Sequence, residues 1–263
     1  MSLRALLAIP AVLLLSYAGA AAAAEPPALA KARALYNAAD YDGAIDAAAL
    51  ARAQGAAMDA AALVAARSHL ERYRQRGDAA DLVTAREALT AVRASMLPPR
   101  DQVDHLVGLG QSLYLANNFG PAAEIFDAAL GRGALLSHRD RLMLLDWWAS
   151  ALDREAQGRP SDRRAPAYER IATRMDEELR QDPANAPANY WLAAAARGTG
   201  DVDRAWSAAA AGWIRARLSP DTAEALRSDL DRLVTQALVP ERTRTKPARD
   251  PFTDWQQLKQ DWP

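Results

Sequence analysis

From Pro27 onward, apolar residues recur every three or four positions in blocks of about 12 to 20 residues, separated by short Gly, Pro, Asn or Asp breaks. This spacing places the apolar side chains on one face of a helix. Alternating Val, Ile, Thr and Tyr runs, which would indicate strands, are missing. The sequence therefore predicts an all-α chain with helices at Pro27–Ala38, Asp42–Ala53, Ala57–Arg76, Ala79–Ser95, Asp101–Ala116, Gly120–Leu130, His138–Ala156, Ala165–Arg180, Ala186–Arg197, Val202–Arg217 and Pro220–Leu238.

Three stretches of the chain repeat one arrangement of small residues across two neighbouring helices. They read Ala32-x2-Leu35-x3-Ala39-Asp40-Tyr41-x2-Ala44, Gly110-x2-Leu113-x3-Asn117-Asn118-Phe119-x2-Ala122 and Ala193-x2-Ala196-x3-Gly200-Asp201-Val202-x2-Ala205. Each stretch has a small residue on both helices, and a short triplet marks the turn between them. Here the chain resembles the tetratricopeptide repeat family.

The resemblance implies a right-handed superhelical stack of antiparallel helix pairs, which is an α-solenoid. Two weaker pairs, Ala57–Ser95 and His138–Asp182, would complete about five pairs, followed by a C-terminal capping helix. One pair cannot bury its apolar face alone, so neighbouring pairs stabilise each other by stacking. We expect residues 25–238 to form this repeat domain, with nearly all of its Ala and Leu side chains in the core.

Residues 1–24 have the organisation of an export signal. Arg4 is the only charge, an apolar run extends from Ala5 to Tyr17, and the small residues Ala22 and Ala24 suit signal peptidase. An uncleaved membrane anchor is the alternative, because the stretch approaches the roughly 20 residues that span a bilayer. We expect cleavage before Glu25, and therefore a periplasmic bacterial protein with no transmembrane span in the mature chain.

The composition narrows the classes of function. Among 263 residues there are 63 Ala, 29 Arg, 3 Lys and no Cys. Alanine favours helix because it gives up no side-chain entropy there, although a GC-rich genome would also produce the Ala and Arg excess. Without Cys there is no disulfide framework, no thiolate metal site and no cysteine nucleophile. A formal charge of −1 argues against nucleic-acid binding, which needs a basic excess.

Candidate partner-binding residues follow from the resemblance, because in that family the first helix of each pair lines the concave surface. Carried over by position, this surface would hold Arg33, Tyr36, Asn37, Asp104, Gln111, Tyr114, Asp146, Ser150, Asp153, Arg154, Tyr190 and Arg197. Tyrosine and arginine with scattered carboxylates suit a protein-binding face. For any single one of these residues, an ordinary solvated position is the simpler interpretation.

All seven tryptophans follow residue 146. In an alanine-rich stack their simplest role is to fill the core to native density. The alternative is an apolar ligand pocket in the C-terminal half, lined by Trp147, Trp148, Trp191, Trp206 and Trp213. Because Trp147 and Trp148 are adjacent, they cannot share a helix face, and we expect one of them to point away from the main core.

Residues 239–263 have a different composition from the repeats. The stretch from Pro240 to Pro251 mixes proline with four basic residues and predicts an extended basic linker. Thr253 would then cap a short helix with Trp255 and Trp262 on one side. We expect this helix to cover the open apolar edge of the last repeat, and docking to a partner or membrane surface is the alternative.

No catalytic constellation and no phosphate-binding glycine loop stands out in the sequence. His69, His105 and His138 lack the neighbours that a metal site needs. We therefore expect a protein that is not an enzyme and uses no cofactor or metal. The leading hypothesis is a scaffold or adaptor that binds a protein or peptide in the cell envelope. The alternative is a periplasmic ligand-binding component of a transport system that carries an apolar molecule such as a lipid.

Overall fold

The computed structural model describes residues 25–55, 57–245 and 250–263, and these form helices and turns without a strand. The predicted export signal lies outside the described residues. Every predicted helical segment contains a helix. These helices are α1 (Pro27–Asn37), α2 (Tyr41–Ala53), α3 (Met58–Arg76), α4 (Ala79–Ala91), α5 (Pro99–Leu115), α6 (Phe119–Leu130), α7 (His138–Gln157), α8 (Ala165–Gln181), α9 (Ala186–Gly198), α10 (Val202–Arg215) and α11 (Pro220–Leu233).

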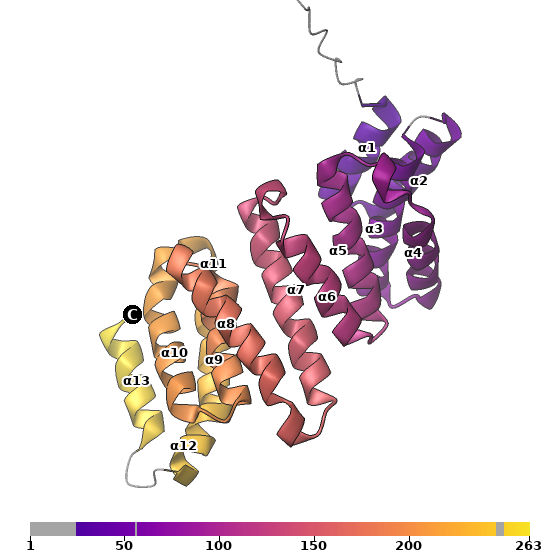
Figure 1. Ribbon diagram of the computed structural model, residues 1–263. Coiled ribbons are helices and arrows are strands. Elements are labelled where there is room, and N and C mark those ends of the chain that lie inside the picture. Colours follow the sequence, from indigo (N-terminus) through magenta and orange to yellow (C-terminus); the bar gives the residue numbers. More distant parts are fainter. Residues whose placement is uncertain (1–24, 56, 246–249) are drawn as a thin grey trace, which may run out of the picture.

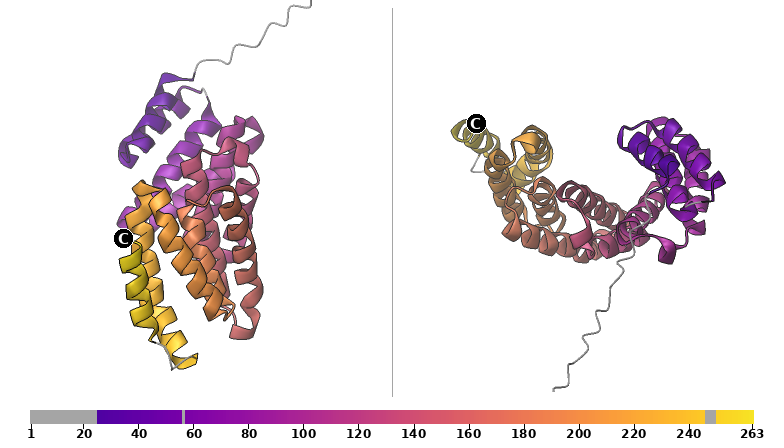
Figure 2. Two further views of the ribbon diagram at one scale, coloured as in Figure 1. Left: turned by 90° about the vertical axis from the view of Figure 1, so that its left-hand side faces the viewer. Right: turned by 90° about the horizontal axis from the view of Figure 1, so that it is seen from above.

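The helices pack in consecutive pairs that stack into an open arc (Figures 1 and 2). The backbones of α1 and α3, α3 and α5, α7 and α9, and α9 and α11 approach closely, and α5 meets α7 through the Tyr114 and Ser150 side chains. Helices α6, α8 and α10 are instead bridged by long side chains, in ion pairs such as Arg170–Asp127 and Arg204–Asp176. In an arc, elements on the inner side are closer together than those on the outer side. The odd-numbered helices therefore line the concave side, which we call the inner surface.

The turn inside each clear repeat has the same backbone conformation. The first residue of each predicted triplet, Ala39, Asn117 or Gly200, has a positive φ of 59°, 59° or 85°. Asp40 and Asp201 then cap the following helices, and their carboxylates accept hydrogen bonds of 3.0 and 2.9 Å from amides in the first turn. The repeated triplet is thus a helix-turn-helix signal with a direct structural cause.

The small residues of the repeated pattern lie in the core of the stack. Ala32, Ala44, Ala122, Ala193 and Ala205 have no exposed surface. The buried apolar residues form three clusters in chain order, one within residues 28–97, one within 103–195 and one within 193–255. A core divided along the stack in this way is typical of pairs that pack only against their neighbours.

The expected extended linker is wrong in its described part. Residues Val239–Thr245 form helix α12, directly after a π-helical turn, η5 (Val234–Leu238). Pro240 lies in the first turn of α12, where its missing amide costs little, and the π-turn absorbs the break in the hydrogen-bond pattern. Lys246 and Arg249 lie outside the described residues.

The last helix, α13 (Pro251–Asp261), covers the end of the stack, as expected. Trp255 is fully buried, and its ring lies 5.9 Å from that of Trp206 and 5.5 Å from that of Trp213. The predicted cap at Thr253 is wrong, because Asp250 accepts the amide of the first turn at 3.1 Å. The Thr253 hydroxyl instead donates to the Asp250 carboxylate at 2.6 Å.

A buried carboxylate joins the two helices of the second pair. Asp81 on α4 is 3% exposed and accepts a hydrogen bond of 2.9 Å from Nε of Arg72 on α3. His69 Nδ1 lies 2.7 Å from the same carboxylate. The Arg72 hydrogen bond lowers the pKa of Asp81 against the opposing effect of burial.

We predict that Asp81→Asn destabilises the protein by about 2 kcal/mol at pH 7, since Arg72 loses its buried charged partner and keeps only the exposed Asp42 at 2.8 Å. The pKa of Asp81 is lowered by folding. Its stabilisation is therefore present above the ordinary carboxyl pKa and is lost as the pH falls through the folded value. Urea unfolding from pH 7 down to pH 2 should show the difference between variant and wild type shrinking. A difference that does not change with pH would contradict this assignment.

Candidate functional site

An aromatic surface connects three inner helices near the middle of the stack. The Tyr114 hydroxyl on α5 lies 2.8 Å from Ser150 Oγ on α7, and its ring meets that of Trp147 edge-on at 4.8 Å. From α3, the Arg74 guanidinium lies 5.2 Å from the centre of the Trp147 ring. Tyrosine, tryptophan and arginine side chains thus form one strip across α3, α5 and α7.

Three carboxylates act electrostatically on Tyr190 in the C-terminal half of the inner surface. Asp146 and Asp153 come from α7 and Asp229 from α11, while Tyr190 lies on α9. Burial is the main cause that raises the pKa of Tyr190. The three carboxylates raise this pKa further, and Arg232 lowers it. Trp191 Nε1 donates to Asp146 Oδ1 at 2.8 Å, which ties α9 to α7. We call Asp146, Asp153, Asp229 and Tyr190 the acidic cluster.

The carboxylates of the acidic cluster have different surroundings, because Asp146 and Asp229 are exposed and Asp153 is half-buried. The walls of the inner surface partly desolvate Asp146 and raise its pKa, an effect that the Trp191 hydrogen bond opposes and the nearby Asp229 increases. Asp229 has an ion pair of 3.1 Å with exposed Arg232. Asp146 and Asp153 form no ion pair with any described residue, and Asp153 instead accepts hydrogen bonds from neutral groups.

Charges on the N-terminal half of the inner surface are paired within the protein. Arg33 Nη2 on α1 lies 2.6 Å from Asp101 Oδ2 on α5. Arg67 Nη1 on α3 lies 3.3 Å from Asp104 Oδ2, and its guanidinium covers the Tyr36 ring at 4.8 Å. The two halves of the inner surface therefore differ in the charge that they offer to a partner.

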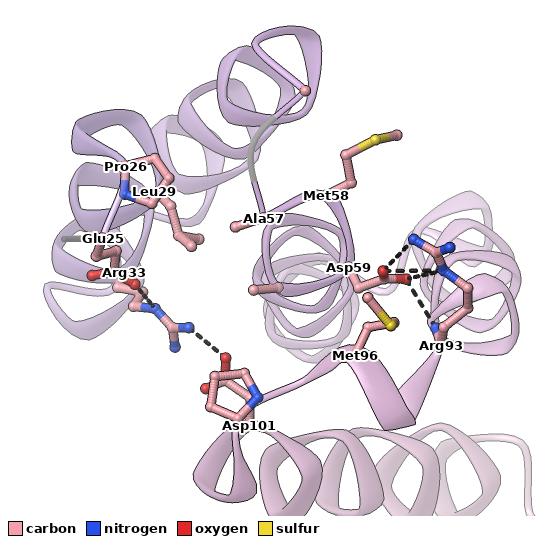
Figure 3. A pocket seen from close by; sticks show the side chains of 13 residues that line it. Glu25, Pro26, Leu29, Arg33, Ala57, Met58, Asp59, Arg93, Met96 and Asp101 are labelled. Carbon is pink, nitrogen blue, oxygen red and sulfur yellow. Dashed lines mark hydrogen bonds and ion pairs between the residues drawn. The ribbon is translucent and has the colours of Figure 1, made fainter. Parts of the chain in front are cut away.

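A pocket of about 430 Å³ lies among the N-terminal ends of α1, α3 and α5 (Figure 3). Its apolar rim includes Met58 and Met96, which are 50% and 64% exposed. The ion pairs that border it are Arg33–Asp101, Arg33–Glu25 and Arg93–Asp59. Because these charged groups satisfy one another, the pocket presents no unpaired charge to a ligand.

The structure brings together most of the residues predicted for the concave surface. On or beneath the inner surface lie Tyr36, Asp104, Gln111, Tyr114, Asp146, Ser150, Asp153 and Tyr190. The others take different positions. Arg33 borders the N-terminal pocket, and Arg197 pairs with Glu241 of α12 at 2.8 Å. Asn37 and Arg154 are exposed, with no side-chain hydrogen bond or ion pair to another described residue.

Reasoning from sequence missed Arg67 and Arg74 on α3 and Asp229 on α11. The second pair is a degenerate repeat, so its register could not be carried over from the family. α11 follows the last recognisable repeat. The sequence did contain one usable signal. Arg67 and Arg74 are seven residues apart, and this spacing places both on the same stripe of a helix.

The five tryptophans considered as a ligand pocket are divided between two core clusters. Trp148 and Trp191 are buried in the middle core cluster, while Trp147 is half-buried against it. Trp206 and Trp213 pack in the C-terminal cluster. The adjacent pair does diverge, since Trp148 points into the core and Trp147 forms part of the aromatic strip.

Two of the histidines have structural contacts. His69 contacts Asp81, and His105 Nε2 lies 2.9 Å from the Leu89 carbonyl oxygen. Within the described ranges, no group of three or more His, Cys, Asp or Glu residues is arranged to hold a metal ion. Nor does any helix there have the length and apolar character needed to cross a membrane.

Comparisons with protein-family models, with curated proteins and with solved structures found no match for this chain. The function is therefore inferred from the residues and their geometry.

Proposed function

We propose that the protein is a non-enzymatic adaptor that binds an extended segment of a partner protein along its inner surface. The observation that carries the proposal is the strip of Arg74, Tyr114 and Trp147, which crosses the three inner helices α3, α5 and α7. Tyr190 on α9 adds a further aromatic side chain, in edge-on contact with Trp191. Tyrosine, tryptophan and arginine are the residues that most often anchor protein interfaces. An open arc gives a long segment room to contact all of them.

The proposal includes the finer expectations from the sequence. We infer a right-handed tetratricopeptide-like superhelix, export through the N-terminal segment and a place in the bacterial periplasm. The alternative, a carrier of an apolar molecule, has less support, because the tryptophans that would line its pocket are divided between two core clusters. Filled cores leave such a ligand no common cavity at those residues.

Photocrosslinking tests the proposal directly. A crosslinking phenylalanine analogue in place of Tyr114 or Tyr190 should capture one and the same partner protein in intact cells, because both side chains face the inner surface. The matched controls are Val83 on α4 and Thr173 on α8, which are exposed on outer helices. We expect these positions to give little or none of that adduct. Equal capture from inner and outer positions, or none from either, would contradict the proposed function.

A further inference from the structure

We propose that the first helix pair is a dimer interface, through which two copies of this chain pack against each other about a twofold axis. The surface is the face of α1 and α2 at the N-terminal end of the arc, which we call the end face (Figures 1 and 2). It is separate from the strip of Arg74, Tyr114 and Trp147 on α3, α5 and α7. Dimerisation and the proposed function are therefore independent of each other.

The end face carries apolar side chains that no described helix covers. A pocket of about 360 Å³ lies between α1 and α2, and its lining residues all belong to these two helices and the turn that joins them. Ala28 and Ala47 are buried along it, whereas Leu50 on its rim is 55% exposed. At the other end of the stack, α13 covers the last helix pair. Because a repeat stack needs its terminal faces covered or polar, the end face has the character of an interface.

Two opposite charges on the end face indicate what covers it. Lys31 on α1 and Asp46 on α2 line the pocket, and both side chains are exposed. Neither has a hydrogen bond or an ion pair to another described residue. Lys31 lies six residues before the end of α1 and Asp46 five residues after the start of α2, so at about 1.5 Å per residue the two charges are nearly level. A complementary partner carries the same two charges with their places exchanged.

A second copy of the end face meets this requirement. When a twofold axis runs along the pocket, parallel to the helices, α1 of each copy lies on α2 of the other. Lys31 of each copy then lies on Asp46 of the other, and the dimer gains two ion pairs.

The apolar residues of the end face match in the same arrangement. Ala28 and Leu50 are both nine residues from the turn ends of their helices, and Leu35 and Gly43 are both two residues from them. The twofold axis therefore lays Leu50 of each copy on Ala28 of the other, and Leu35 on Gly43. Large side chains meet small ones at both levels, as in a well-packed interface. Such a dimer has two inner surfaces, so a partner with two binding segments gains affinity from the second contact.

Charge reversal tests the twofold arrangement in the protein purified from the cells that produce it. K31E and D46K each turn both ion pairs into like-charge pairs, so each should weaken self-association about tenfold or more in sedimentation equilibrium. An equimolar mixture of K31E and D46K should regain the dimer, because opposite charges then face each other in both pairs. The controls R139E and D162K reverse exposed charges elsewhere and should change self-association less than about twofold, alone or mixed.

A second variant tests the apolar contact. Leu50→Ser should weaken the dimer about tenfold or more, because two copies of the side chain lose their contact at once. Val83→Ser is the matched control, since Val83 is 54% exposed on outer helix α4 and lies outside the end face. Circular dichroism confirms that each variant is folded before its self-association is compared.

Three results would overturn the dimer. The first is wild-type protein that stays monomeric up to its highest soluble concentration, because another segment then covers the end face or nothing does. The second is a dimer that the end-face substitutions weaken no more than their controls. The third is a mixture of K31E and D46K that fails to regain the dimer, because a twofold interface requires it. Failure of the inner-surface crosslinks would contradict the proposed function and leave the dimer unaffected.

Discussion

Trp255→Ala should open the C-terminal end of the stack and lower the free energy of unfolding of its last repeats by about 3–5 kcal/mol. Trp255 is fully buried, contacts Trp206 and Trp213, and donates from Nε1 to Asp231 Oδ1 at 2.8 Å. Its removal leaves a large cavity and takes one of two donors from Asp231 Oδ1, which keeps its ion pair with Lys259 at 2.8 Å. In a stack, the loss of a capping helix exposes the apolar face of the pair beneath it. Hydrogen exchange should therefore show faster exchange in α10 and α13 than in α5 and α6.

The matched control is Trp262→Ala. Trp262 is 40% exposed, and its backbone carbonyl, which the substitution keeps, accepts the Trp213 indole at 2.9 Å. We expect a change within about 1 kcal/mol. Equal destabilisation by the two substitutions would show that α13 is not held by its buried ring, and α13 would then be free to act as a docking segment.

Gly110→Ala should destabilise the protein by about 3 kcal/mol, near the upper end of the cost of overpacking a core. A Cβ at this position would overlap Cε1 of Phe126, which is fully buried on α6. The ring cannot move freely, because it also lies 5.9 Å from the ring of Trp147. The same substitution should therefore disturb the aromatic strip. Thermal unfolding and the near-ultraviolet circular dichroism of the tryptophans measure the two effects.

Gly131→Ala controls for the change of residue type. Gly131 has an ordinary φ of −61°, and a Cβ there would meet its nearest atom at 3.5 Å. We expect a neutral effect or stabilisation by about 0.5 kcal/mol, because alanine has less freedom in the unfolded chain. If Gly110→Ala were as mild as this control, the close approach of α5 and α6 would be refuted.

Sequence patterns predicted the helices well because the repeats encode them locally. The spacing of apolar residues by three and four predicted the position of each helix. Ala39, Asn117 and Gly200, which have a positive φ, lie where the triplet predicted a turn. The patterns failed where neighbouring turns compensate for an unfavourable residue. Pro240 indicated an extended linker, but the preceding π-turn allows a helix to include it.

The candidate site was predictable in part, in the clear repeat that holds Tyr114 and also in the weaker pair that holds Ser150. Tyr114 and Ser150 were assigned to the concave surface and do meet across α5 and α7. Arg197 was assigned there as well, but it pairs with Glu241 of α12, a helix that the sequence did not predict. The acidic cluster depends on Asp229, which follows the last recognisable repeat. Contacts between segments far apart in the chain have no local signal.

The central claim is that the partner lies along the inner surface. The most direct measurement is hydrogen exchange of the protein alone and in complex with the partner captured by crosslinking. We expect protection of α5, α7 and α9, strongest around Tyr114 and Tyr190, and unchanged exchange in α4, α6 and α8. Protection confined to those outer helices, or to the N-terminal pocket at Met58 and Met96, would contradict the claim.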